Sequence, residues 1–387
     1  MRDLKAEHNF LPEQYRVANQ AAINHNYLKQ QFAEYQEIFR RLEALIIEGD
    51  YTLGKAVDEF ETRVSTICQT KYAIGVGSGT DALFLSLKAL DIGAGDEVIT
   101  TPYTFFATIG AIVTAGATPV FADIGPDYNI DAAKIEPAIT KRTKAVLPVH
   151  WAGLICDMDK IQKTAAAHKL AIVEDACHAI QATYCGRASG SLSDAGCFSM
   201  HPLKNLNVWG DGGFITTNSK ELHDRLVLLR NHGLIDRDHC AVFAYNSRLD
   251  TLQAIVANYL LEHRLENITR RRIENAHTYD QLLSDCSHVE IPQRPKDIKQ
   301  VYHLYIIRAR RRDELKEYLN SKGIDAKVHY PVPMHLQPAA KEFGYKRGDF
   351  PVAEKTCNEV ISLPLHEYIT RDQCETVARH VREFYAK

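Results

Sequence analysis

The chain has 387 residues and a formal net charge of −3, with 45% hydrophobic and 25% charged residues, as is ordinary for soluble globular proteins. This charge disfavours a nucleic-acid partner, and no stretch approaches the roughly 20 apolar residues of a membrane span. The nine cysteines contain no C-x-x-C pair, so no zinc ribbon and no metal site is predicted. The polar N-terminus, residues 1–25, lacks the apolar core of a signal peptide, and the sequence therefore predicts a cytoplasmic protein.

The first predicted element is an amphipathic helix over Phe32–Glu48, where Phe39, Leu42, Leu45 and Ile46 recur at helical spacing. From about residue 72, short apolar runs alternate with longer helical patterns. The predicted strands are Tyr72–Val76, Glu97–Thr100, Thr118–Ala122, Ala145–His150, Ala171–Glu174, Ala195–Ser199 and Gly213–Thr217. Helices predicted between them include Thr80–Leu90, Phe106–Ala115 and Met158–His168.

This alternation of strands and helices predicts βαβ units and a mainly parallel sheet, whose strands are buried on both faces. After Asp250 the pattern is helical through about Cys286, and a shorter α+β stretch follows. We therefore predict an α/β protein in three parts. They are an N-terminal segment and helix packing on the small domain (residues 1–48), a large domain with a seven-stranded sheet between helices (49–265) and a small C-terminal α+β domain (266–387).

A glycine-rich turn, Gly75-Val-Gly77-Ser-Gly79-Thr80, follows the first predicted strand and opens a helix. Glycines let the backbone approach a ligand closely, and a helix N-terminus offers free N–H groups to an anion such as a phosphate. A dinucleotide fingerprint would need a third glycine where Thr80 stands. The turn therefore predicts a phosphate site, with a plain tight turn as the alternative.

Two further residues lie at strand ends, where ligands of α/β sheets bind. Asp175 ends an apolar strand, although such an acid also serves as a helix cap. Lys204 follows the strand ending at Ser199, in a loop closed by Gly210-Asp-Gly-Gly213. A lone loop lysine is usually a solvated charge. A phosphate turn, a strand-end acid and a lysine in a closed loop are together what pyridoxal 5′-phosphate (PLP) requires of a protein.

At this point the chain resembles the DegT/DnrJ/EryC1/StrS family of PLP-dependent sugar aminotransferases, which have the aspartate-aminotransferase fold. The resemblance covers roughly residues 45 to 370 and rests on short motifs that occur in the family's order. These are Gly77-Ser-Gly-Thr-Asp-Ala-Leu83, Thr101-Pro-Tyr-Thr-Phe-Phe-Ala107, Glu174-Asp-Ala-Cys-His178, Ser199-Met-His-Pro-Leu-Lys-Asn205, Gly210-Asp-Gly-Gly213, Arg230-Asn-His-Gly233 and Tyr245-Asn-Ser-Arg248.

The resemblance assigns a role to each matching residue. Lys204 forms the Schiff base with the cofactor, Asp175 pairs with its pyridine nitrogen, and His178 sits beside the ring. Asn246 is implied to reach the phosphate of the neighbouring subunit in a homodimer with shared sites. The remaining implied cofactor contacts are Phe105, which stacks on the ring, and the phosphate-binding Gly79, Thr80 and Ser199.

The implied reaction is a ping-pong transfer of an amino group from an amino acid, with L-glutamate expected, to a keto- or aldehydo-sugar. Family members that dehydrate sugars carry His in place of the Schiff-base lysine, so Lys204 favours transamination. The expected pathways are the synthesis of cell-surface polysaccharide, lipopolysaccharide or amino sugars. A PLP-dependent sugar dehydratase or racemase and a non-catalytic PLP sensor are the alternatives.

The acceptor is less well defined by the sequence. Trp151, His329 and Tyr330 are predicted to contact it, although the latter two suit a domain interface equally. Trp151 and Ala152 depart from the commoner His-Leu-Tyr-Gly form of their motif. A nucleotide-linked keto-deoxyhexose and an eight-carbon sugar acid both remain open as acceptors. A nucleotide diphosphate would need cations, for which the candidates are Arg237, Arg248 and Lys327.

Overall fold

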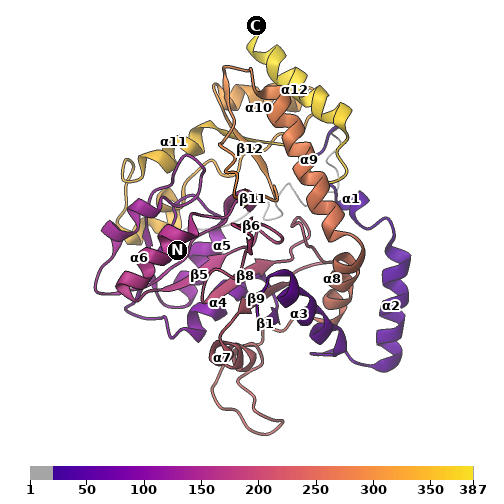
Figure 1. Ribbon diagram of the computed structural model, residues 1–387, viewed down its shortest axis with the longest axis vertical. Helices are drawn as coiled ribbons and strands as arrows, with labels where there is room; N and C mark the ends of the chain where they lie inside the picture. The colour runs from indigo at the N-terminus through magenta and orange to yellow at the C-terminus, as the bar shows by residue number, and fades with distance from the viewer. Residues whose placement is uncertain (1–20, 387) are drawn as a thin grey trace, which may run out of the picture.

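The computed structural model describes residues 21–386 (Figure 1). Its centre is a seven-stranded sheet in the order β1-β9-β8-β5-β4-β2-β3. Every neighbouring pair is parallel except those of β9, which runs antiparallel to both β1 and β8. The strands are β1 (Tyr72–Val76), β2 (Glu97–Thr100), β3 (Thr118–Phe121), β4 (Thr143–Val146), β5 (Ala171–Asp175), β8 (Ala195–Ser199) and β9 (Gly213–Thr217).

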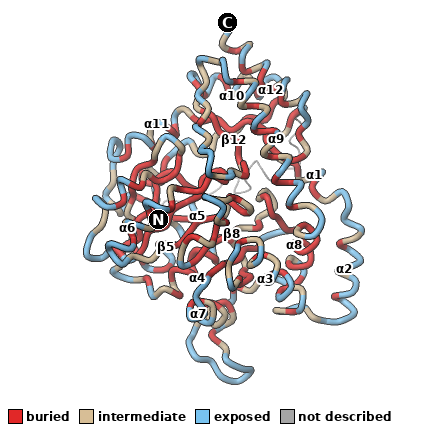
Figure 2. The backbone as a smooth tube through the Cα atoms, viewed as in Figure 1, coloured by how far each residue is buried: buried red, intermediate tan, exposed pale blue. Residues whose placement is uncertain are grey.

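Two layers of helices enclose this sheet, each over its own apolar core. One core joins the sheet to α3 (Lys55–Ile67), α6 (Met158–His168) and α8 (Thr251–His263). The other joins it to α4 (Gly79–Ala89), α5 (Phe106–Thr114) and α7 (Lys220–Arg230). Figure 2 shows the buried backbone concentrated between these layers. The predicted seven-stranded, mainly parallel sheet between helices is therefore confirmed.

A smaller α+β unit follows the break between α8 and α9 at Arg264. Its three-stranded antiparallel sheet has the order β10-β12-β13 and a separate apolar core. The elements are α9 (Leu265–Leu283), β10 (Val289–Glu290), β12 (Tyr305–Ala309), α10 (Arg312–Ser321), α11 (Pro351–Glu359), β13 (Val360–Leu363) and α12 (Arg371–Tyr385). A third small sheet contains β6 (Thr183–Tyr184), β7 (Arg187–Ala188) and β11 (Ile298–Lys299).

The N-terminal helix differs from its prediction. The chain enters through a short turn, α1 (Leu28–Gln31), and α2 spans Tyr35–Glu48. This helix packs on α8, one of the helices that cover the large sheet, whereas we expected it on the small domain. Its buried side chains are Ile38 and Leu45, while Phe39 and Ile46 are 54% and 63% exposed. Helical spacing alone could not tell the buried Ile38 and Leu45 from the exposed Phe39 and Ile46, because adjacent apolar residues fit the same amphipathic pattern.

The predicted strand over residues 145–150 is also different. β4 ends at Val146, and Val149 forms only an isolated bridge to Asp175. The chain then turns through a 3₁₀ segment, Trp151–Gly153, in which Ala152 has φ +52°. This turn directs the side chain of Trp151 into the molecule at the carboxyl edge of the sheet. No helix among residues 21–386 has the length and apolar character of a membrane span.

Candidate active site

A cavity of about 380 Å³ lies at the carboxyl edge of the large sheet, where the segments after β1, β5 and β8 meet. Residues from the small unit close its other side, so the cavity lies where the two parts of the chain face each other. It brings together all the predicted catalytic, cofactor-binding and acceptor-contacting residues except Asn246, and of the candidate cations it contains Lys327. Those lining it are Gly79, Thr80, Phe105, Trp151, Asp175, His178, Ser199, Lys204, His329 and Tyr330.

One end of the cavity is formed by the first turn of α4. The Ser78 hydroxyl caps this helix by accepting a hydrogen bond from the Asp81 N–H at 3.0 Å. A Cβ atom added to Gly79 would lie 2.6 Å from Cβ of Ser199 and 3.0 Å from Sγ of Cys177. Only glycine therefore lets the helix start lie directly against the end of β8. The first N–H groups of α4 and the Ser199 hydroxyl form a cradle that suits a phosphate.

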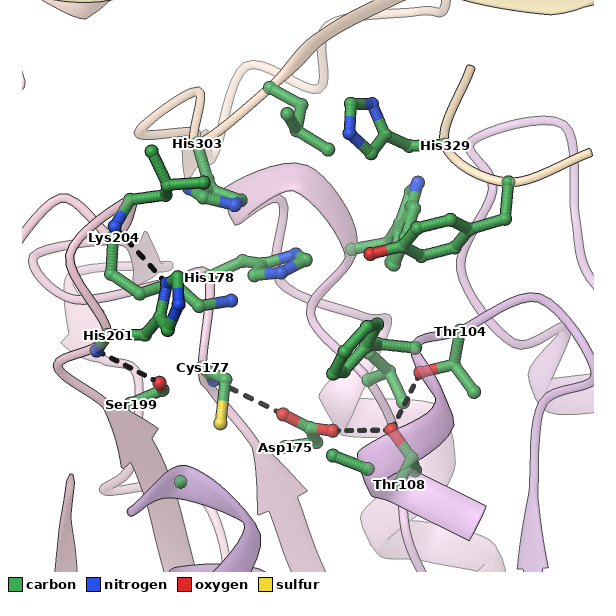
Figure 3. A pocket seen from close by; sticks show the side chains of 18 of the residues that line it. Thr104, Thr108, Asp175, Cys177, His178, Ser199, His201, Lys204, His303 and His329 are labelled. Atoms are coloured by element: carbon green, nitrogen blue, oxygen red, sulfur yellow. Dashed lines mark hydrogen bonds between the residues drawn. The ribbon is translucent and has the colours of Figure 1, made fainter. Parts of the chain in front are cut away.

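Asp175 lies buried at the end of β5, held by two hydrogen bonds (Figure 3). The Thr108 hydroxyl donates to Oδ2 at 2.8 Å, and the Cys177 N–H donates to Oδ1 at 3.3 Å. The hydroxyls of Thr104 and Thr108 are themselves 2.7 Å apart. These contacts fix the carboxylate in one orientation. A fixed, buried carboxylate stabilises a proton on a nearby ring nitrogen.

Lys204 reaches the same cavity from the loop after β8. Its backbone N–H donates to the carbonyl oxygen of His201 at 2.8 Å, and the Asn207 side chain donates to its carbonyl oxygen at 2.8 Å. Burial lowers the pKa of the Lys204 amine, while the nearby Cys177 and Asp175 act in the opposite direction. A lysine with a lowered pKa has a larger neutral fraction, which is the form that attacks a carbonyl.

His178 forms a wall between these groups. Its ring centroid lies 4.1 Å from that of His303 and 5.2 Å from that of Trp151. Burial, followed by the Lys204 charge, lowers the pKa of His178 well below its usual value, so the imidazole is neutral. Its Nδ1 atom is buried and has no hydrogen-bond partner among the residues described. Because buried polar atoms usually have a partner, an unpartnered Nδ1 atom on a residue that lines the cavity indicates that a polar ligand atom completes its hydrogen bonding.

Comparison with known proteins accounts for this combination of groups. Residues 33–382 match the model of the DegT/DnrJ/EryC1/StrS aminotransferase family. The chain belongs to this family. The resemblance drawn from the motifs is thereby confirmed.

Individual relatives of this aminotransferase cover nearly its whole length. A "Pleiotropic regulatory protein" of Geobacillus stearothermophilus is 41% identical, over 92% of this chain and 97% of the relative. The dTDP-3-amino-3,4,6-trideoxy-alpha-D-glucose transaminase of Streptomyces venezuelae is 40% identical, over 91% and 94%. The structure of S. venezuelae DesV in complex with a ketimine intermediate has a TM-score of 0.92 at 39% identity, over 94% and 99%.

A second solved structure bears on the cofactor. It is ntda from Bacillus subtilis with its cofactor PMP bound, with a TM-score of 0.86 at 30% identity, covering 93% of this chain and 85% of the other. The residues of the present aminotransferase fit PLP, of which PMP (pyridoxamine phosphate) is the amino form. The α4 cradle suits the phosphate, Asp175 suits the ring nitrogen, and the free Nδ1 of His178 suits a polar ring substituent.

Asn246 and the segment before it are not among the residues that line this cavity. Asn246 forms an isolated bridge with Asn231 just after α7. Residues 234–244 project from the end of the molecule below α7 (Figure 1), and Phe243 on this projection is 99% exposed. The neighbouring Ser247 bonds to the glycine-rich turn, accepting from the Gly77 N–H at 3.1 Å. The predicted contact of Asn246 with a neighbouring subunit stays a prediction.

The side of the cavity opposite Asp175 is rich in neutral rings. Burial lowers the pKa of His329 to about 3, and its Nδ1 atom lies 2.9 Å from the Ser362 hydroxyl. The Tyr330 ring lies 5.7 Å from Trp151 and 5.8 Å from Phe105, which is 45% exposed. This arrangement suits an uncharged hydroxylated ring next to the cofactor. The stacking role of Phe105 remains a prediction.

The cations predicted to bind an acceptor are differently placed. Lys327 lines the cavity, but its Nζ atom lies 2.8 Å from Oδ1 of Asp325. Arg237 is exposed on the projecting segment, and Arg248 donates to the Asn231 side chain at 3.2 Å. Within the described part of the chain, no group of three or more His, Cys, Asp or Glu side chains could hold a metal ion.

Several residues of the cavity carry no local signal that sequence analysis could use. They are His25, Tyr27, Thr108, Arg272 and His303. His303 packs on His178, although the two are far apart in the sequence. Thr108 lies in the first turn of α5, and a threonine at such a position carries no sequence signal of a functional role. Only the folded arrangement shows that it orients Asp175.

Proposed function

We propose that this PLP-dependent aminotransferase moves an amino group from L-glutamate to a keto- or aldehydo-sugar. The observation that carries the proposal is the presence, in one cavity, of a buried Lys204 amine with a lowered pKa and a fixed Asp175 carboxylate. These are the two groups on which PLP-dependent proton transfer depends. The transaminase names of the relatives support the reaction class.

When bound, PLP supplies an aldehyde that amines can attack and a ring that accepts the electron pair left when a C–H bond breaks. Lys204 provides the attacking amine because burial favours its neutral form. With the donor bound, Lys204 would act on the proton of the donor's α-carbon, taking it as a general base and returning one as a general acid. Asp175 would keep the ring nitrogen of the cofactor protonated, because a buried negative charge nearby stabilises the positively charged form of that nitrogen.

The proposed acceptor is a nucleotide-linked keto-deoxyhexose. Neutral Trp151, His329 and Tyr330 side chains suit hydroxyl groups and an apolar sugar face. The dTDP-sugar transaminase among the relatives favours this acceptor over an eight-carbon sugar acid. Such a reaction serves amino-sugar synthesis for polysaccharide or lipopolysaccharide, which we place in the cytoplasm.

A regulatory role without catalysis is the second candidate, because one relative is named a pleiotropic regulatory protein. A sensor that binds PLP would need the same lysine and carboxylate, so these two groups do not separate the candidates. The match to the aminotransferase family and the transaminase name of another relative favour catalysis. Lys204 likewise disfavours a sugar dehydratase, whose family members carry His at this position.

The absorption spectrum tests the proposed donor reaction. The PLP-loaded protein is expected to show the visible band of lysine-bound PLP, and addition of L-glutamate is expected to replace it with the near-ultraviolet band of pyridoxamine phosphate. A spectrophotometric titration measures both. A visible band that glutamate leaves unchanged would contradict glutamate as the donor, and absence of the band after loading would contradict the role of Lys204.

We further infer that the protein acts as a homodimer with shared sites. The projecting segment after α7 carries apolar side chains that are exposed in a single chain and that a partner would bury. Asn246 lies at the base of this segment. Ile235 and Val242 on the projection are 67% and 44% exposed. A second copy of the chain would bury them and bring Asn246 to the partner's α4 cradle.

A mixing experiment tests these shared sites. Lys204→Ala and Asn246→Ala variants are each expected to be weakly active or inactive alone. After the two are unfolded and refolded together, roughly a quarter of the wild-type activity is expected, because half of the dimers are mixed and each has one intact site. Activity assays after refolding measure this recovery. No recovery, with mixed dimers verified by tag purification, would contradict the contribution of Asn246 across the interface.

A further inference from the structure

The segment before α2, residues 23–31, forms a strap that joins the small unit to the lysine loop. At its start, the Ile23 N–H donates to the Gly323 carbonyl at 3.0 Å, and the Asp325 N–H donates back to the Ile23 carbonyl at 2.9 Å. At its end, the Gln31 side chain donates to the Pro202 carbonyl at 2.8 Å. The strap therefore touches both parts of the chain that form the cavity.

Tyr27 is the central residue of this strap and is almost fully buried. Its hydroxyl lies 3.3 Å from the carbonyl oxygen of Leu203 and 3.4 Å from that of Lys204. A hydroxyl has one proton to donate, so the two carbonyls share it. Burial raises the pKa of Tyr27, and the phenol therefore keeps this proton at any physiological pH.

Arg272 fixes the hydroxyl from the other side. Its Nη2 atom donates to the Tyr27 hydroxyl at 2.7 Å and lies 3.3 Å from a carboxylate oxygen of Glu367. Its Nη1 atom contacts the carbonyl oxygens of Tyr302 and His303 at 3.3 Å. Donation from a charged guanidinium polarises the phenol and strengthens its own donation to the lysine loop.

We propose that Tyr27 is a positioning residue for Lys204, holding the backbone of Leu203 and Lys204 so that the lysine amine meets the cofactor. The role rests on the proposed function and extends it to a residue of the N-terminal segment. Lys204 lies in a loop whose backbone is held locally by His201 and Asn207, and the Tyr27 hydroxyl adds a contact from a distant segment of the chain. A displacement of about 1 Å is enough to slow a positioned reaction markedly.

The test replaces Tyr27 with phenylalanine, which keeps the ring and removes only the hydroxyl. The rate at which added PLP develops its visible band with the cofactor-free protein measures attack by the Lys204 amine, which forms a C=N bond and releases the aldehyde oxygen as water. This rate is expected to fall about tenfold in Tyr27→Phe, the equivalent of one shared hydrogen bond. The affinity for pyridoxamine phosphate, which makes no bond to the lysine, is expected to stay within about twofold.

Tyr279→Phe is the matched control. Tyr279 is a buried phenol whose hydroxyl donates to the Pro364 carbonyl at 2.9 Å, and it does not line the cavity. Its loss is expected to lower the thermal unfolding midpoint as much as Tyr27→Phe does, without changing the rate of PLP attachment. Gln31→Met, which removes the strap's contact with Pro202, serves as a second variant and is expected to slow attachment less.

The outcomes separate this inference from the proposed function. If the wild-type protein attaches no PLP, the proposed function fails. If the wild type attaches PLP and Tyr27→Phe does so at the same rate, only the positioning role is wrong. Equal losses of PLP attachment and pyridoxamine phosphate affinity in Tyr27→Phe would also overturn it, because they would show a general loosening of the cavity.

Discussion

Replacing Lys204 with alanine is expected to abolish amino transfer while leaving weak binding of PLP. The variant loses both the amine that attaches the cofactor and the base that moves the donor's proton, and general acid–base catalysis alone contributes up to about ten-thousandfold. We expect turnover to fall roughly a thousandfold or more. Measurement of product formation from glutamate and a keto-sugar, together with the visible spectrum, checks both parts of the prediction.

Lys341→Ala provides the control for this variant, since Lys341 is exposed and lies outside the cavity. It is expected to keep the visible band and the wild-type rate. PLP should still be retained by Lys204→Ala because the α4 cradle and Asp175 are unchanged. Turnover by Lys204→Ala within tenfold of the wild type would contradict the assignment of this lysine.

Three of the predicted site residues share one property, which is that each lies at or close to a strand end. Gly79, Asp175 and Ser199 follow or end β1, β5 and β8. Apolar runs locate such strands, and the topology of a parallel sheet brings their carboxyl ends to one edge. Short-range patterns therefore sufficed to predict the sheet and to place the glycine-rich turn and Asp175 at its carboxyl edge, whereas the roles of these residues toward the cofactor came from the family resemblance and stay predictions.

Other contacts around the cavity join segments that are far apart in the sequence, and the sequence did not predict them. Tyr27 meets Lys204 across 177 positions, and Arg272 meets Tyr27 across 245. A similar case is the fully buried pair of His150 and Glu174, whose nitrogen and oxygen atoms are 2.7 Å apart. Burial opposes ionisation of Glu174, but its contacts with His150, the Gly190 N–H and the Ser193 hydroxyl together lower the carboxyl pKa. No periodicity or local motif marks such pairs, because partner choice is a property of the packed structure.

Exchange of Asp175 for asparagine is expected to lower the rate of amino transfer about a hundredfold with little change in PLP attachment. The amide keeps the size of the side chain and can still accept from the Thr108 hydroxyl, which lies 2.8 Å from Oδ2. It loses the charge that holds a proton on the ring nitrogen, and an opposite charge at this range typically shifts a pKa by about 1 to 3 units. Two units correspond to the hundredfold expected. Single-turnover kinetics with glutamate measure the effect.

Thr108→Val separates the charge of Asp175 from its orientation. Valine keeps the shape of Thr108 but removes the hydroxyl that orients the carboxylate and meets Thr104 at 2.7 Å. Because the charge remains, the loss should be only about tenfold, close to that of one hydrogen bond to a charged group. If Asp175→Asn were no slower than Thr108→Val, the carboxylate would act only through hydrogen bonding. The protonated ring nitrogen would then have no part in the proton transfer made by Lys204.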